Sequence, residues 1–244
     1  MYISNPNLPK EKSSAVLIDY RAEKAFKALK AFGIKVLVTP NVNIAYSAIS
    51  GHADIAFHHL NEQYAVAAPD VYDYYCSIFG KEHIICGDKK IESTYPGDAA
   101  YNIARIGNTI FHNLKYTDKN ILEYYRAKGT KLINIKQGYS KCSVCIVSET
   151  ALITEDISIQ KAALKESFDV LLIGKGAVSL KGFPYGFIGG ASGLISNDVL
   201  LFNGKIENHP DFCRIKSFCA NYGVKTMSAG NYTLEDIGSI ISIK

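Results

Sequence analysis

Residues 142–173 read CSVCIVSETALITEDISIQKAALKESFDVLLI. Two short apolar runs, VCIV and TALIT, flank Ser148-Glu149, and an amphipathic stretch, DISIQKAALKES, separates them from a third apolar run, DVLLI. Short apolar runs bounded by turn residues are typical of buried strands, whereas the amphipathic stretch has the spacing of a helix. The segment therefore predicts the order strand, turn, strand, helix, strand.

The same order occurs in three further segments, residues 52–86, 101–135 and 191–227. A fifth unit is divided between the two ends: DIGSIISIK closes the chain, and SSAVLID, YRAEKAFKALKAF and IKVLV lie near its beginning. Repeats of this kind pack on their neighbours and bury a shared core. We expect a single α/β domain over residues 1–244, a five-bladed propeller of ββαβ units. Pairing of the N- and C-terminal segments would close it and cover the sheet edges that an open array exposes.

The composition is that of a folded protein with a substantial core. Of the 244 residues, 48% are hydrophobic and sixteen are tyrosine. The net charge of +4 is spread along the chain without a block of like charges, so no nucleic-acid partner is expected. No apolar run approaches the roughly 18 to 20 residues that cross a bilayer, and the start, MYISNPNLPKEK, has no apolar signal region. We expect a cytoplasmic protein without a membrane partner, in which all six cysteines are free thiols.

Any functional site should lie in the loops that join the third strand of one unit to the first strand of the next, because these loops converge on one end of the ring axis. His52 and Asp54 open the unit at residues 52–86. If they lie on a strand, residues two apart project from the same face and enter one pocket. The alternative is a capping pair in a surface turn.

Cys142 opens the next unit but one, directly after Lys141. A neighbouring cation favours the thiolate, the form that attacks carbon. The alternative is a small apolar residue at the start of a strand. Cys145 follows three positions later, which on a strand points it to the opposite face, so the two cysteines are interpreted as unrelated.

Glu235 and Asp236 are adjacent acids at the head of the divided unit. A carboxylate pair can bind a guanidinium through parallel hydrogen bonds, although such pairs are more often solvated surface. The glycine-rich segment 186–193 does not have a phosphate-binding spacing, and we expect backbone packed tightly near the axis. His58, His59, His83, His112 and His209 show no metal-like spacing with acids or cysteines, so no metal site is predicted.

The five units, the motif His52-Ala-Asp54 and the segment GYSKCSVCIV resemble the pentein superfamily of guanidine-modifying enzymes. Its members include arginine deiminases, dimethylarginine dimethylaminohydrolases, agmatine deiminases and amidinotransferases. The resemblance covers nearly the whole chain, follows the dimethylarginine hydrolases in layout, and points to a bacterial branch without an assigned reaction.

The resemblance implies roles for particular residues. Cys142 would be the nucleophile that forms a covalent thiouronium intermediate, His52 the proton shuttle and Asp54 its partner. Glu235 or Asp236 would bind the guanidine, with no metal or organic cofactor. The loop before Cys142 is one residue shorter than in the family, which leaves Lys141 as an alternative at the nucleophile position and otherwise as a substrate contact. Ala191 follows Gly189-Gly190 where the family pattern continues with an acid.

Two functions follow. The first is an enzyme, a hydrolase or amidinotransferase, acting on a small guanidine- or amidine-containing molecule. The second is a non-catalytic pentein that binds a partner through its rim, similar to the ribosome anti-association factors that share this fold.

Overall fold

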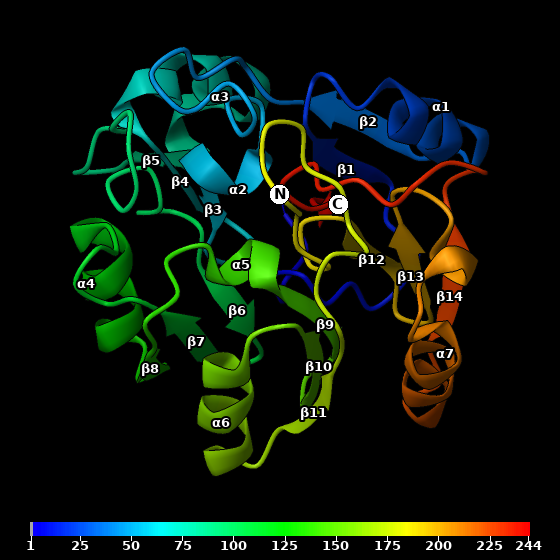
Figure 1. Ribbon diagram of the computed structural model, residues 1–244. Helices are drawn as coiled ribbons and strands as arrows, with labels where there is room; N and C mark the ends of the chain where they lie inside the picture. Colours follow the sequence, from blue (N-terminus) through cyan, green and yellow to red (C-terminus); the bar gives the residue numbers. More distant parts are fainter. Residues whose placement is uncertain (1) are drawn as a thin grey trace.

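The computed structural model describes residues 2–244 and contains five three-stranded sheets around a common centre (Figure 1). In every sheet the first two strands in ββαβ order are antiparallel, and the third is parallel to the second. A parallel pair requires a crossover, and a helix provides it each time. The predicted unit is therefore confirmed in all five copies.

Four of the sheets are each built from one continuous segment of the chain. The first sheet has β3 (Phe57–His59), β4 (Ala65–Ala67), α3 (Tyr72–Phe79) and β5 (Ile84–Cys86). The second has β6 (Ala104–Ile106), β7 (Thr109–His112), α4 (Lys119–Ala127) and β8 (Lys131–Asn134). The third has β9 (Val144–Ser148), β10 (Ala151–Thr154), α6 (Ile157–Lys165) and β11 (Asp169–Leu172). The fourth has β12 (Ser192–Ser196), β13 (Val199–Phe202), α7 (Phe212–Asn221) and β14 (Lys225–Ser228). Short 3₁₀ turns occur at Pro69–Val71, Lys81–His83 and Ile206–Asn208.

The fifth sheet joins the two ends of the chain. Its strands are β15 (Ile241–Ser242), β1 (Ala15–Ile18) and β2 (Lys35–Val38), with α1 (Glu23–Ala31) between β1 and β2. β15 pairs antiparallel with β1, which brings Val16 opposite Ser242 and Leu17 opposite Ile241. The predicted closure of the ring by the terminal segments is confirmed.

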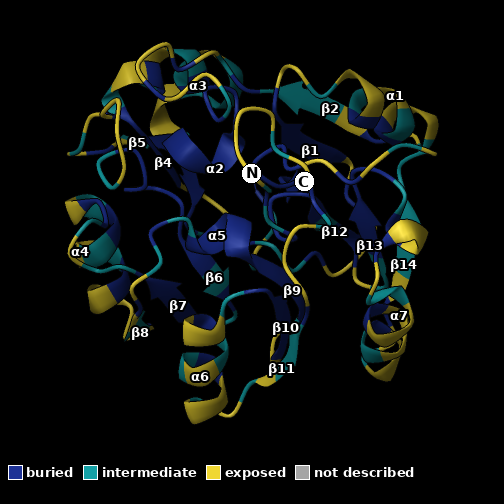
Figure 2. Cartoon of the chain, in the orientation of Figure 1, coloured by how far each residue is buried: buried dark blue, intermediate teal, exposed yellow. Residues whose placement is uncertain are grey.

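Burial decreases from the centre of the ring outward. The first and second strands are almost wholly buried, whereas the third strands are half exposed. Neighbouring first strands contact one another, as β6 does with β9 and β12 does with β15. The helices pack one apolar stripe inward, for example Ile121 and Tyr125 of α4, and their outer faces are exposed (Figure 2).

Two short helices interrupt the predicted strands at the centre. The strand expected to carry His52 and Asp54 is in fact the one-turn helix α2 (Ala53–Ala56), which His52 directly precedes without a side-chain capping bond, and Cys142 lies in the one-turn helix α5 (Ser140–Ser143). Short apolar stretches do not distinguish a strand from a single helical turn, because both periods fit four residues. The strands β3 and β9 begin only after these turns.

All six cysteines are free, as the sequence predicted. Within residues 2–244, no helix combines the length and apolar character needed to cross a membrane.

Candidate active site

The side chains of His52, Asp54 and Cys142 meet near the centre of the ring, where α2 and α5 lie (Figure 1). One nitrogen, one oxygen and one sulfur atom from the three residues all lie within 4.8 Å of one another, and all three residues are buried. The thiol of Cys142 donates a hydrogen bond to Asp54 Oδ2 over 3.0 Å. A buried thiol thus has a carboxylate as its direct partner.

Asn102 holds the backbone around the thiol. Its Oδ1 accepts hydrogen bonds from the backbone N–H groups of Lys141 (2.8 Å) and Cys142 (3.2 Å), and its Nδ2 lies 3.2 Å from Cys142 Sγ. The first N–H groups of a helix have no partner within the helix. Asn102 provides that partner for α5 and so orients the cysteine.

Ser239 connects Asp54 to a buried cation. Its hydroxyl lies 3.0 Å from Asp54 Oδ2 and 3.1 Å from the carbonyl oxygen of Gly189, and it accepts a hydrogen bond from Lys141 Nζ over 3.0 Å. Ser239 has φ of 74°, in the left-handed region that non-glycine residues rarely adopt. The strained backbone brings its hydroxyl between the ammonium and the carboxylate.

His52 faces a second carboxylate. Its Nδ1 lies 3.8 Å from Asp236 Oδ1, and among residues 2–244 neither ring nitrogen has a hydrogen-bond partner. Asp236 accepts hydrogen bonds from the backbone N–H groups of Phe187 (2.9 Å) and Gly238 (3.0 Å). Gly238, at φ of 66°, packs directly against His52, where a Cβ would clash. This packing fixes the imidazole beside Asp236.

His52, Cys142 and Asp236 line one side of a cavity of about 220 Å³. The rest of its lining is made of aliphatic and aromatic side chains, including the tyrosines Tyr139 and Tyr185. Ligand sites commonly combine an apolar wall with a few convergent polar groups. The cavity therefore has the layout of a site for a small ligand.

Three of the predicted site residues do not line this cavity: Asp54, which contacts it only through the Cys142 thiol, Lys141 and Glu235. Lys141 is buried, and its ammonium contacts Ser239 rather than the cavity. Glu235 is exposed and lines an adjoining cavity of about 470 Å³, which shares Leu180 and Asp236 with the first. Of the two adjacent acids, only Asp236 faces the thiol and the imidazole together.

Burial and charge keep the thiol protonated. Desolvation raises the pKa of Cys142 well above its ordinary value, and Asp54 and Asp236 raise this pKa further. The sequence led us to expect that Lys141 would favour the thiolate, and this stays a prediction: the ammonium donates to Ser239, and burial lowers the pKa of Lys141 while the charges of Asp54 and Cys142 raise it. Burial also raises the pKa of Asp236. The resting site is therefore a thiol beside acidic groups, which favours a cationic ligand.

Glu155 is a further buried acid behind this site. Its Oε2 accepts the backbone N–H of Ile188 over 3.3 Å, and Oε1 has no partner among the described residues. Burial raises the pKa of Glu155 to about 8, and the charge of Asp236 adds to the shift. The carboxyl is thus held mostly in its neutral form at neutral pH.

A family model described as "Family of unknown function (DUF6873)" matches residues 17–241. The chain belongs to this family. No curated protein matches the chain in sequence.

Three of the solved structures to which this chain is similar are an amidinotransferase, a deiminase and a DDAH. The inosamine-phosphate amidinotransferase of Streptomyces griseus has a TM-score of 0.61 at 6% identity, with 100% of this chain and 97% of that chain covered. The agmatine deiminase of C. jejuni with substrate bound has a TM-score of 0.57 at 11% identity, covering 100% and 96%. The Pseudomonas aeruginosa DDAH complexed with citrulline has a TM-score of 0.57 at 7% identity, covering 94% and 96%. The DUF6873 protein therefore has the pentein fold, as the sequence resemblance implied.

Sequence reasoning missed Asn102 and Ser239, although the repeat contains a signal for both. Cys142 stands two positions before the first strand of its unit, which begins at Val144. Asn102 stands two positions before Ala104 and Ser239 two before Ile241, so the three residues occupy equivalent places in their units. Superposing the five units on the start of the first strand would have selected them.

The glycine-rich segment 186–193 is packed tightly near the axis, as predicted. A Cβ on Gly190 would collide with the carboxylate of Asp236, and one on Gly189 with backbone oxygens of Val144 and Cys142. The absence of side chains at these two positions lets the segment close over the acid. The acid that the family pattern would put after Gly190 is replaced by buried Ala191.

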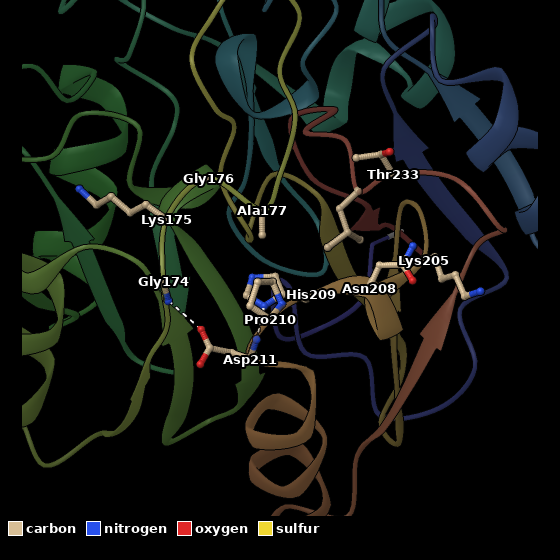
Figure 3. Close-up of a pocket in the computed structure, with 11 residues that line it drawn as sticks. Gly174, Lys175, Gly176, Ala177, Lys205, Asn208, His209, Pro210, Asp211 and Thr233 are labelled. Atoms are coloured by element: carbon tan, nitrogen blue, oxygen red, sulfur yellow. Dashed lines mark hydrogen bonds between the residues drawn. The ribbon is translucent and has the colours of Figure 1, made fainter.

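Another cavity, of about 380 Å³, lies between the loop after β11 and the start of α7 (Figure 3). Lys175 and Lys205 point away from each other at its two sides, and Asp211 accepts a hydrogen bond from the backbone N–H of Gly174 over 2.8 Å. None of the predicted site residues lines it. The candidate active site is therefore the smaller, central cavity.

Proposed function

We propose that this protein is an amidino-group-modifying enzyme in which Cys142 attacks the central carbon of a guanidine or amidine. The observation that carries the proposal is the meeting of the Cys142 thiol, the His52 imidazole and the Asp236 carboxylate in the lining of one cavity, with Asp54 hydrogen-bonded to the thiol beside it. The similarity in fold to amidinotransferases and deiminases supports the reaction class.

The substrate would be a cation. A guanidinium next to Asp236 offers N–H groups to a carboxylate, an interaction in which both partners are charged. The same positive charge opposes the effect of Asp54 and Asp236 on the thiol, and so lowers the pKa of Cys142. Binding of the correct substrate would thus help to generate the thiolate that attacks it.

In the first step the Cys142 sulfur forms a bond to the guanidinium carbon. The thiol proton leaves toward Asp54, its hydrogen-bond partner, and His52 gives a proton to the departing nitrogen as the carbon–nitrogen bond breaks. The products of this step are an amine or ammonia and a covalent thiouronium on Cys142.

In the second step a nucleophile attacks the thiouronium carbon, and His52, now neutral, accepts its proton. Water as the nucleophile gives a hydrolase, in which the second proton of water leaves as the carbonyl product forms and is taken up by the released ammonia or amine. An amine as the nucleophile gives an amidinotransferase. Cleavage of the carbon–sulfur bond returns the electron pair to sulfur, which regains the proton held at Asp54. His52 acts as acid and then as base, and neither step changes an oxidation state.

Labelling with 2-chloroacetamidine tests the proposal, because this reagent presents an amidinium next to an alkylating carbon. Peptide mass spectrometry after limited labelling should find the adduct on Cys142, and Cys142→Ser should remove it. His52→Ala should abolish turnover of guanidine substrates, measured as released ammonia or amine. Cys213→Ser, at an exposed cysteine far from the cavity, is the matched control and should label normally.

Labelling spread evenly over the six cysteines would contradict the enzyme proposal. Pull-down of a stable partner complex from extract, together with such unselective labelling, would favour the non-catalytic, partner-binding alternative.

A further inference from the structure

We infer that the guanidine or amidine substrate carries an uncharged aliphatic or aromatic body, rather than the amino-acid head group of arginine. The inference rests on the proposed function, since it concerns the substrate of that same site. It follows from the chemistry of the cavity wall and mouth. It follows also from the hydrogen bonds that already occupy the guanidinium of Arg21 in the adjoining cavity.

The cavity wall offers hydrocarbon contacts above the reacting residues. Ile49, Ile55 and Leu180 supply aliphatic surface, and Phe183, Tyr185 and Phe187 supply aromatic rings. Tyr185 and Phe187 pack edge to face with their ring centroids 6.1 Å apart, which fixes the orientation of this wall. No lysine or arginine of residues 2–244 lines the cavity, so its wall offers no cation to a carboxylate.

Two cations, Arg21 and Lys181, line the adjoining cavity, and neither lines the central one. Lys181 is exposed, so water solvates its ammonium and screens its charge. The Arg21 guanidinium is already engaged: Nε and Nη2 donate to the carboxylate of Asp19, and Nη1 and Nη2 donate to the backbone oxygens of Ser47 and Ala48. An arginine bound in this way is neutralised by its partner and has few donors left. Arg21 therefore stabilises the loop at residues 47–48 and is not available to bind a substrate carboxylate.

The mouth of the cavity is apolar as well. Phe183, at the cavity, is 44% exposed and packs edge to face with Tyr46, which is 40% exposed, at a centroid distance of 6.1 Å. On another side, Tyr139 of the cavity wall contacts Tyr95, which is 44% exposed, at 5.2 Å. Large aromatic side chains exposed together around an opening mark a surface that binds apolar ligand. A hydrocarbon body leaving the cavity would contact these rings.

Together these features separate the two ends of the substrate. The cationic amidino group would lie at the acidic side beside Asp236 and Cys142, and the uncharged body would lie against the rings above. A charged carboxylate in the same position would lose water without gaining a partner.

The experiment compares how well different guanidines bind and protect the site. Equilibrium binding to Cys142→Ser is measured by calorimetry for methylguanidine, butylguanidine, hexylguanidine, phenylguanidine, arginine and agmatine. Protection of wild-type Cys142 against 2-chloroacetamidine is measured with the same compounds. Affinity should rise by about fourfold for each added methylene until the cavity is filled. Phenylguanidine should bind at least about tenfold more tightly than arginine.

Variants test the wall directly. Phe183→Ala should weaken the binding of phenylguanidine and hexylguanidine several-fold while leaving methylguanidine unchanged, and Phe183→Leu should retain most of the affinity. Tyr64→Ala is the matched control, because Tyr64 is also an exposed aromatic residue but lies outside the cavity.

The two proposals fail in different ways. Unselective labelling of the cysteines would overturn the proposed reaction. The affinities of the guanidines for Cys142→Ser would still show whether the site prefers an uncharged body to the head group of arginine. Arginine binding as tightly as phenylguanidine, or affinity that does not rise along the alkyl series, would overturn the present inference even if Cys142 is labelled selectively.

Discussion

The thiol of Cys142 donates a hydrogen bond to Asp54 across 88 positions of sequence, over 3.0 Å. Both groups are buried. Burial raises the pKa of Cys142, and the neighbouring carboxylates of Asp54 and Asp236 raise this pKa further. We therefore expect the reactivity of the cysteine to depend on the charge of the surrounding acids and of the reagent.

Asp236→Asn should change the rate of Cys142 alkylation in opposite directions with two reagents. Removing the Asp236 charge lowers the pKa of the thiol, and each unit of decrease gives about ten times more thiolate. Neutral iodoacetamide should therefore react faster near pH 8, whereas cationic 2-chloroacetamidine should react more slowly because its carboxylate partner is gone. Rates are measured by mass spectrometry, and circular dichroism checks folding.

Glu235→Gln is the control for the previous variant, because Glu235 adjoins Asp236 in sequence but is exposed and outside the central cavity. It should change neither rate by more than about twofold, given the screening of exposed charges. A parallel decrease of both rates in Asp236→Asn would show that the acid acts on the thiol in another way.

Ser239→Ala and Ser239→Gly should separate backbone strain from the role of the hydroxyl. Both variants remove the hydroxyl between Lys141 and Asp54, which leaves the thiol as the remaining side-chain donor to Asp54 Oδ2. The carboxylate should then hold the thiol proton more strongly, so the pH profile of 2-chloroacetamidine labelling should move to higher pH in both.

Their stabilities should differ, because residue 239 has φ of 74°. Alanine is strained in the left-handed conformation and glycine is not, so urea unfolding should find Ser239→Gly more stable than Ser239→Ala by about 1 kcal/mol. Labelling profiles identical to wild type would exclude a positioning role for this hydroxyl.

Glu155→Gln should remove a pH dependence of stability. The carboxyl has an ordinary pKa of 4.5, which burial raises to about 8 in the folded protein. Between these values the native state binds more protons than the unfolded state, so the contribution of Glu155 to stability is present at low pH and is lost as pH rises toward 8. The limiting slope for one group is about 1.4 kcal/mol per pH unit.

The measurement is urea unfolding of both proteins, followed by far-UV circular dichroism, at several values between about pH 5 and pH 9. The stability of wild type minus that of Glu155→Gln should fall with pH across this window and then become constant. The other titrating groups are common to both proteins, so the difference isolates Glu155. A difference that does not vary with pH would mean that the carboxyl is not held neutral.

Zinc should inhibit the site without being required by it. His52, Asp54 and Cys142 are residue types that bind Zn²⁺, and their atoms lie close enough together to share an ion. Added Zn²⁺ should slow 2-chloroacetamidine labelling, because ligation occupies the sulfur, and a chelator should restore the rate. His52→Ala should weaken the inhibition. Loss of labelling when wild type is treated with chelator alone would instead indicate a metal-dependent site.

Much of the fold was predictable because strand and helix periods are local properties. The apolar runs of residues 142–173 and their counterparts predicted each ββαβ unit, and the incomplete patterns at the two ends predicted the pairing of β1 with β15. The one-turn helices α2 and α5 were not predictable in this way, since their form depends on tertiary partners such as the Asn102 side chain, which accepts from the N–H groups of α5.

By itself, the amino-acid sequence predicted the repeat and the closure of the ring, and it placed His52, Asp54 and Cys142 at the heads of units, where a shared site was one of the open interpretations. Only the tertiary structure decided which polar atoms pair there: Asp54 with the thiol, Asp236 with the imidazole, and Lys141 with Ser239. The physical reason is that a hydrogen bond depends on distances of a few ångströms between side chains. Those distances are set by how five separate units pack around the axis, and no local pattern within one unit contains them.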